Sequence, residues 1–152
     1  MEKFVKINGK NVRLQEDNSL DLSHMNLHSV PNFNGKTKEI ISTIPTLNLS
    51  CNGINQIDNL DGFHSLQRLM LNHNKIEKIE NLGHLDNLIR LDISDNEISA
   101  IEGLEDLSNL KQLNLKGNKI PNELIKKLGG YKLFGTEVKD PDKFVQYCKE
   151  KK

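Results

Sequence analysis

The chain has 152 residues, a hydrophobic content of 36%, and 21 basic residues against 21 acidic ones. A chain of this length can form one domain with a continuous core. The balanced charge argues against nonspecific binding to nucleic acid or to an anionic membrane, because both depend on an excess of basic residues. We therefore expect neither nucleic acid nor a membrane among the partners of the chain.

Residues 1–17 are expected to form an N-terminal cap. Alternating apolar residues flank Asn8 and Gly9, and Asn-Gly in such a context is a strong signal of a β-hairpin. The hairpin would cover the open edge and the core of the unit that follows it. These residues hold no apolar run of signal-peptide length, and no later stretch could span a bilayer, so the cytoplasm is the expected location.

Residues 18–120 are dominated by a repeat of 22 residues. Segments that begin at Ile44, Leu66, Leu88 and Leu110 align without a gap on apolar-x-x-Leu-x-(Leu/Ile)-x-x-Asn-x-Ile. A fixed period of this kind is the signature of a solenoid, because one coil cannot close its own core and must stack on its neighbours. A weaker copy precedes these four, with Leu20 and Leu22 in the places of Leu47 and Leu49, and makes about five repeats in all.

The first copy differs from the other four in two ways. Met25 stands where Asn is expected, and five extra residues separate this copy from the next. We expect Thr37 to cap a short helix in the insertion, with Ile40 and Ile41 on the outer, convex side. An atypical first unit is usual at the end of an array.

Within each repeat, two alternating apolar residues mark a short strand whose side chains point into the core. The Asn that follows should lie where the chain bends away from the strand. A buried amide can satisfy backbone groups that such a turn leaves without partners. We therefore assign a structural role to an asparagine ladder that consists of Asn52, Asn74, Asn96 and Asn118.

Residues 121–152 are expected to form a helical C-terminal cap. Pro121 opens one predicted helix, which ends at Gly129-Gly130. A second helix is predicted to start at Asp140-Pro141. Its candidates for the inward face are Phe144, Val145, Tyr147 and Cys148.

The segment from Ile76 to Leu82 reads Ile-x-x-Ile-x-x-Leu after the Asn, and it resembles the short class of leucine-rich repeat named after the regulatory subunit of protein phosphatase-1. The resemblance covers roughly residues 18–120. It implies a right-handed α/β solenoid with a parallel sheet on its concave side. It also implies a non-catalytic scaffold or adaptor that binds a protein or peptide on the concave strand face without a cofactor. We expect a monomer.

Outward-pointing strand residues should form columns with a spacing of about 4.8 Å. Arg68 and Arg90 stand side by side in one column, near Met70 and Asp92. Arginine can hold a carboxylate in a bidentate manner, so this group could anchor an acidic segment of a partner. Alternatively, the arginines pair locally with Asp92 on a solvated face. The other candidate partner-binding residues are Asn48, Asn72, Asn114 and Lys116.

A row just beyond the strands contains His24, Cys51, His73 and Asp95. These are zinc-ligand types on successive strands, and they could converge on one ion. No zinc-binding spacing motif supports that arrangement, so the interpretation is that the chain has no metal site. We also expect no catalytic residue and no enzyme, because no motif supplies a general base for a nucleophile and no phosphate-binding loop is present.

A self-associating or structural module is the alternative to a binding scaffold. It would depend on the convex face, the edge strands or the terminal helix rather than on the concave columns. The concave columns contain no aromatic residue. Affinity for a partner is therefore expected to be modest, about micromolar.

Overall fold

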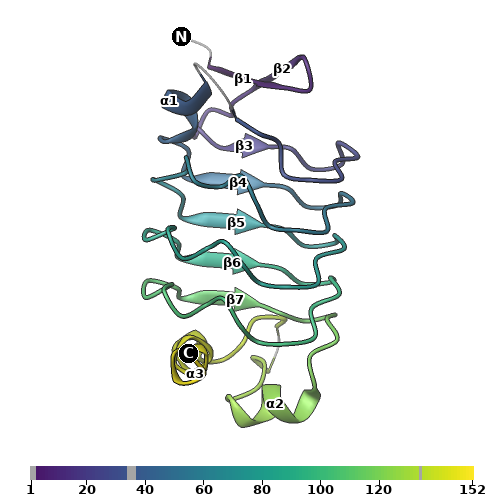
Figure 1. Ribbon diagram of the computed structural model, residues 1–152, viewed down its shortest axis with the longest axis vertical. Helices are drawn as coiled ribbons and strands as arrows, with labels where there is room; N and C mark the ends of the chain where they lie inside the picture. The colour runs from purple at the N-terminus through teal and green to yellow at the C-terminus, as the bar shows by residue number, and fades with distance from the viewer. Residues whose placement is uncertain (1–2, 34–36, 134) are drawn as a thin grey trace.

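The computed structural model describes residues 3–33, 37–133 and 135–152. This part of the chain is a linear stack of coils with a hairpin at one end and two helices at the other (Figure 1). The coils share one parallel sheet of order β3-β4-β5-β6-β7, in which each strand pairs with the strand of the next repeat. We number the coils by their strands, so that the first coil contains β3 and the fifth contains β7.

The strands of the sheet are short, because each coil contributes only its few alternating residues. Their bounds are Leu20–Asp21 (β3), Thr46–Asn48 (β4), Arg68–Met70 (β5), Arg90–Asp92 (β6) and Gln112–Asn114 (β7). The predicted column of leucines is confirmed by the pairing of residues 22 positions apart. Leu47 pairs with Leu69, Leu69 with Leu91, and Leu91 with Leu113.

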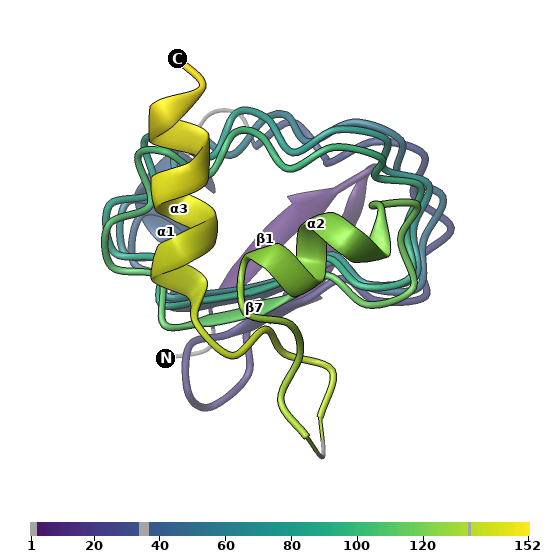
Figure 2. The same ribbon diagram turned by 90° about the horizontal axis from the view of Figure 1, so that it is seen from below.

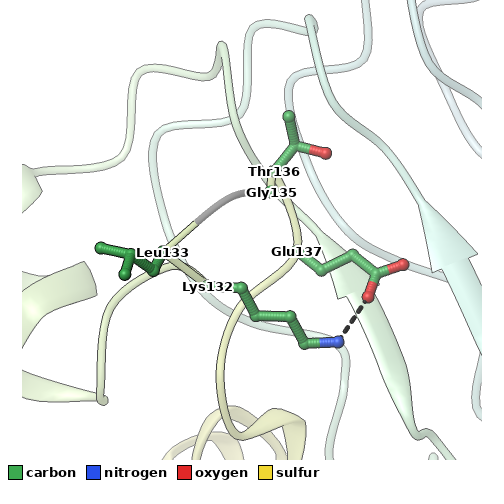
Figure 3. Close-up of a pocket in the computed structure, with 5 residues that line it drawn as sticks. All are labelled: Lys132, Leu133, Gly135, Thr136 and Glu137. Atoms are coloured by element: carbon green, nitrogen blue, oxygen red, sulfur yellow. Dashed lines mark hydrogen bonds and ion pairs between the residues drawn. The ribbon is translucent and has the colours of Figure 1, made fainter.

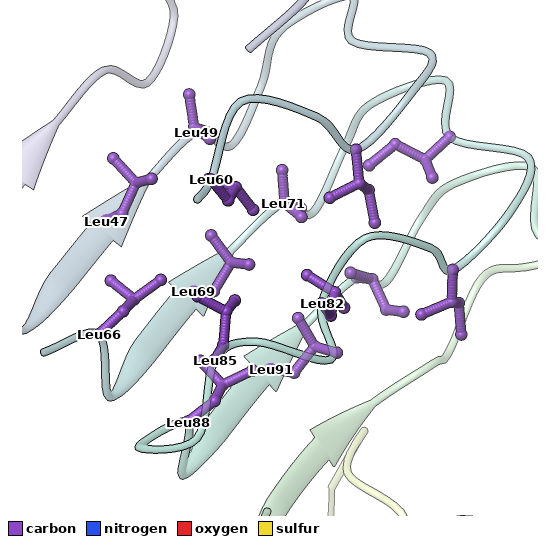
Figure 4. Packing of buried hydrophobic residues seen from close by; sticks show 14 of the residues in the cluster. Leu47, Leu49, Leu60, Leu66, Leu69, Leu71, Leu82, Leu85, Leu88 and Leu91 are labelled. Atoms are coloured by element: carbon purple, nitrogen blue, oxygen red, sulfur yellow. The ribbon is translucent and has the colours of Figure 1, made fainter. Parts of the chain in front are cut away.

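The core lies between this sheet and the returning segments of the coils. Leu69 and Leu91 point inward from successive strands, toward Leu82 and Leu85 of a returning segment (Figure 4). All four side chains are buried. The returning segments of the second, third and fourth coils contain turns in place of a helix, as the spacing of three residues between their apolar positions predicts. In one such turn, Leu85 N donates to Leu82 O at 2.9 Å.

The N-terminal hairpin forms as predicted. β1 (Phe4–Ile7) and β2 (Lys10–Arg13) are antiparallel, and they are joined by Asn8 and Gly9 with φ values of 48° and 80°. Two positive φ angles in a two-residue turn are typical of type I′ hairpins. The hairpin contributes buried Val5 and Ile7 to the core, but it forms a sheet of its own. It therefore covers the core without pairing with the edge of β3.

The short helix α1 (Thr37–Ile41) lies in the predicted insertion, with two differences from the prediction. Thr37 is the first residue of the helix instead of a cap before it. Ile41 is buried, and it fills the space that a Cβ atom on Gly62 would need. The helix therefore packs against the next coil, and the expectation that Ile41 lies on the outer side is wrong. Residues 34–36 of the insertion lie outside the described residues.

Both predicted C-terminal helices are present, and they lie across the end of the stack (Figure 2). α2 (Asn122–Lys127) follows Pro121 and ends in a Schellman motif, in which Gly129 N donates to Lys126 O and Gly130 N donates to Ile125 O. α3 (Pro141–Glu150) closes the core with residues that were predicted to face inward. Phe144, Val145 and Cys148 are buried, and Tyr147 is partly buried. Among the described residues, no helix has the length and apolar character needed to cross a membrane.

Candidate functional site

The asparagine ladder joins each coil to the coil before it. The Oδ1 atom of Asn96 accepts a hydrogen bond from Ile76 N at 3.0 Å, and its Nδ2 donates to Leu71 O at 2.9 Å and to Ile93 O at 3.1 Å. Asn52, Asn74 and Asn118 make equivalent bonds. This geometry explains Met25. An Asn at that position would have no earlier coil to bridge, so the first coil does not need one.

The returning segments of the coils contain a second column of asparagines, which the sequence analysis did not predict. Asn59 and Asn81 have φ values of 55° and 58°, and their Nδ2 atoms donate to Val30 O at 3.0 Å and to Ile57 O at 2.7 Å. Gly103 takes the same place in the fourth coil, with a φ of 69°. Asn and Gly adopt the left-handed conformation most easily, so an Asn/Asn/Gly column at the repeat spacing is the signal that reveals this turn.

Polar residues on the concave face cap the ends of most strands. The Oδ1 atoms of four residues accept a hydrogen bond from the backbone N–H two positions later, at 2.9 to 3.3 Å. These residues are Asp21, Asn48, Asp92 and Asn114. Ser50 and Ser94 add a hydroxyl donor to the same oxygen, at 2.7 Å in each case. Three of the predicted partner-binding residues, Asn48, Asp92 and Asn114, thus hold the backbone of their own coils.

Arg68 and Arg90 lie opposite each other in the register of β5 and β6. Arg68 is exposed, and it forms no ion pair within the described part of the chain. Arg90 donates through Nη1 to Gln112 Oε1 at 3.3 Å and lies 3.6 Å from Glu137 Oε1. The alternative in which Asp92 pairs with the arginines is not observed, because the Asp92 oxygens accept bonds from Ser94 and Asn114.

The carboxylate on Arg90 comes from the C-terminal cap. Residues 131–133 and 135–138 run past β7 and project on the concave side of the sheet (Figure 2). Val138 N donates to Leu113 O at 2.8 Å, and Glu137 forms an antiparallel bridge with Asn114. Lys132 Nζ lies 2.7 Å from Glu137 Oε2 (Figure 3). No repeat signal in the sequence points to Glu137, so its place on the concave face was missed.

This C-terminal segment borders an open surface pocket of about 500 Å³, drawn in Figure 3. The pocket is lined by Lys132, Leu133, Gly135, Thr136 and Glu137. Leu133 points away from the Lys132–Glu137 pair and is 84% exposed. The two charged side chains of the pocket are therefore engaged with each other.

The electrostatic environment of the concave face includes the segment before β3. Hydrogen bonds from Ser19 lower the pKa of the Asp17 carboxyl below its ordinary value. The largest contribution comes from the Ser19 hydroxyl, which donates to Asp17 Oδ1 at 2.6 Å. The positive charge of Arg68 makes a smaller contribution in the same direction. Asp17 is fully exposed, so its interaction with Arg68 is screened by solvent. This weak contact leaves the guanidinium of Arg68 available.

The row of candidate zinc ligands is a column of left-handed turn residues. His24, Cys51, His73 and Asp95 have φ values from 53° to 56°, and Gly117 continues the row with a φ of 75°. Cys51 lies beyond the end of β4 (Thr46–Asn48). His73 Nε2 is 3.7 Å from Asp95 Oδ2. Within the described ranges, no three His, Cys, Asp or Glu residues are grouped in a way that could hold a metal ion.

The two cysteines, Cys51 and Cys148, are not bonded to each other. Cys148 lies on the buried side of α3, and this burial raises the pKa of its thiol above its ordinary value. A thiol with a raised pKa is a poor nucleophile at neutral pH, so Cys148 acts as a packing residue.

Comparison with known proteins agrees with this geometry. The family model described as leucine-rich repeats in two copies matches residues 86–128. The structure of internalin C2 from Listeria monocytogenes is 32% identical with a TM-score of 0.57, and the match covers 68% of this chain and 43% of the internalin. The chain is a leucine-rich repeat protein.

Two further structures are similar to this leucine-rich repeat protein. The internalin InlF of Listeria monocytogenes is 28% identical with a TM-score of 0.53, and the match covers 64% of this chain and 28% of the internalin. A leucine-rich repeat protein of Leptospira interrogans shares the fold at 24% identity and a TM-score of 0.52, with coverage of 64% and 26%. The chain spans less than half the length of these three relatives. No curated protein sequence matches it significantly.

Proposed function

We propose that this leucine-rich repeat protein is a non-catalytic, cytoplasmic scaffold whose concave face binds an acidic segment of a partner protein. One observation carries the proposal. Arg90 already holds a carboxylate, that of Glu137, while Arg68 stands beside it in register without an ion pair in the described residues. Two neighbouring guanidinium groups repel each other unless anions compensate them. A second carboxylate, supplied by a partner, would relieve this repulsion.

The size of the surface sets the class of partner. Five strands at the spacing of paired β-strands span roughly 20 Å. That dimension suits a peptide or the edge of a small domain, with at most about 800 Å² buried on each partner. Arginine is enriched among the residues that dominate binding energy at such interfaces. We therefore expect a single acidic segment to account for most of the affinity.

Reversing the charge of the arginine pair should abolish this binding. Peptides that bind the wild-type protein would be selected from a random library, and their affinities measured by calorimetry. We expect Arg68→Glu with Arg90→Glu to weaken binding by about 100-fold, because the charge-assisted hydrogen bond from Arg68 is lost and two new negative charges repel the acidic segment. Arg68→Glu alone should cost about tenfold, and it leaves the contact between Arg90 and Glu137 intact.

A matched control reverses two charges elsewhere. Lys78 and Lys127 are exposed residues outside the sheet, and neither forms an ion pair with another described residue. The variant Lys78→Glu with Lys127→Glu should bind the selected peptides as the wild type does. Melting curves of all variants should agree within a few degrees. Equal binding by the arginine and lysine variants would contradict the proposed site.

Self-association is a second candidate, and charge separation along the chain favours it. Residues 111–152 contain 11 lysines and 5 acidic residues, whereas residues 1–110 contain 16 acidic and 10 basic residues. A basic C-terminal end could contact the acidic coils of another copy. This arrangement predicts association at low salt that dissociates at high salt, as measured by sedimentation equilibrium. A monomer at both salt concentrations would eliminate it.

A further inference from the structure

The capping of strand ends is interrupted in the third coil. In the other four coils, an Asp or Asn side chain accepts a hydrogen bond from the backbone N–H two positions later. The third coil has Met70 at this position, and its side chain offers no oxygen. The donor concerned, the N–H of Asn72, has no hydrogen-bond partner among the described residues.

This free donor faces the concave surface. Met70 pairs in register with Asn48 and Asp92, so the N–H of Asn72 is equivalent to the donors that those two side chains reach from the concave side. Leu49 O belongs to the adjacent coil and could be an internal acceptor. It already accepts bonds from the amides of Asn52 and Asn74, at 3.0 Å each. The coil therefore leaves one backbone donor open to a ligand.

Three binding features follow one another along β5 and the two residues after it. Arg68 supplies an exposed guanidinium, Met70 a half-buried thioether, and Asn72 the open N–H. In an extended chain, four residues span about 13 Å, so the two polar features lie roughly that far apart. Met70 lies between them and offers an apolar contact that adapts to the shape of a partner side chain.

We infer that the third coil binds an extended segment with two carboxylates four residues apart and an apolar residue between them. One carboxylate lies on Arg68, the other accepts the hydrogen bond of the Asn72 N–H, and the apolar residue covers Met70. The inference rests on the proposed function and specifies the chemistry of the partner. Charge complementarity supports it, because Arg68 forms no ion pair with another described residue, and Arg90 in the same column already holds a carboxylate.

The test uses the full ¹⁵N-labelled chain and the peptide acetyl-Asp-Gly-Leu-Gly-Asp-amide, followed by amide NMR. In the free protein, the Asn72 amide should resonate upfield of Ser50 and Ser94, whose amides are hydrogen-bonded. Titration with the peptide should move it downfield in a saturable manner. The peptide with Asn in place of both Asp residues should bind about tenfold more weakly, because its oxygens carry no charge.

Met70→Asn supplies the missing acceptor within the chain. We expect this variant to melt at a higher temperature than the wild type and to bind the acidic peptide about tenfold more weakly. The control Met70→Leu keeps the donor open and an apolar side chain in place, so its affinity should stay within about twofold of the wild type. A variant that folds more stably yet binds less cannot be explained by damage to the fold.

The outcomes separate this inference from the proposed function. If the peptide binds through Arg68 but leaves the Asn72 amide unmoved, or if Met70→Asn binds as the wild type does, the inference is wrong and the acidic site stands. The inference is also wrong if the Asn72 amide is already hydrogen-bonded in the free protein. It is equally wrong if this peptide does not bind at all. If Arg68→Glu binds library-selected peptides as well as the wild type, the proposed function fails instead.

Discussion

Replacing Asn96 by Ala is expected to lower the free energy of unfolding by about 3 kcal/mol. Asn96 is 6% exposed and makes four hydrogen bonds. Two of them, with Ile76 N and Leu71 O, bridge the third and fourth coils. The carbonyl groups of Leu71 and Ile93 would keep a second donor, from Asn74 and Asn118 respectively. The N–H of Ile76 would lose its acceptor in the interior, and a buried donor without a partner is costly.

Asn87→Ala is the matched control for this prediction. Its Nδ2 also bridges two coils, donating to His64 O at 2.9 Å, but this bond lies at the surface. Water can replace this hydrogen bond, so the free energy of unfolding should fall by less than about 1 kcal/mol. Urea unfolding followed by circular dichroism measures both variants. Similar losses for the two variants would show that the buried ladder has no special role.

Gly103→Ala is expected to destabilise the protein by about 3 kcal/mol or more. Gly103 has a φ of 69°, a conformation that costs an L-residue with a side chain roughly 1–2 kcal/mol. In addition, a Cβ atom there would overlap the carbonyl oxygen of Ile79 in the preceding coil. That oxygen belongs to the backbone, so the fourth coil would have to move away from the third.

Gly130→Ala separates the two parts of this cost. Gly130 has a similar φ of 73°, but a Cβ atom added to it would have no neighbour within 4 Å among the residues that the structure describes. Its substitution should therefore cost only the backbone part, about 1–2 kcal/mol. Urea unfolding gives the free energy of unfolding of each variant. The difference between the two values is the cost of the overlap between the added Cβ atom at position 103 and the preceding coil. Equal costs would mean that the coils adjust freely at Gly103.

The predicted partner residues fall into two groups once the structure is known. Asn48, Asp92 and Asn114 have the polar character of binding residues, yet their side chains hold the turn that follows each strand. Sequence alone does not separate these roles, because Asp and Asn suit both a solvated face and a turn. Met70 breaks the polar pattern of its column, and Arg68 forms no ion pair with another described residue, so these two form the candidate site.

The sequence by itself determined the stacked coils, the core columns and the asparagine ladder. Each of these contacts joins residues separated by the 22-residue period or close to it, so the repeat alone specifies them. Both caps were also predictable, because Asn8-Gly9 and Gly129-Gly130 are local signals of a hairpin and of a helix end. In these regions the short-range preferences of the chain agree with its fold.

Only the tertiary structure decided which polar groups of the concave face are engaged and which are open. Glu137 reaches Arg90 because residues outside the repeats fold back over β7, and no period relates the two residues. The open N–H of Asn72 follows from distances between one backbone donor and every oxygen around it. Hydrogen bonds depend on separations of about 3 Å, and the packing of the whole chain sets those separations.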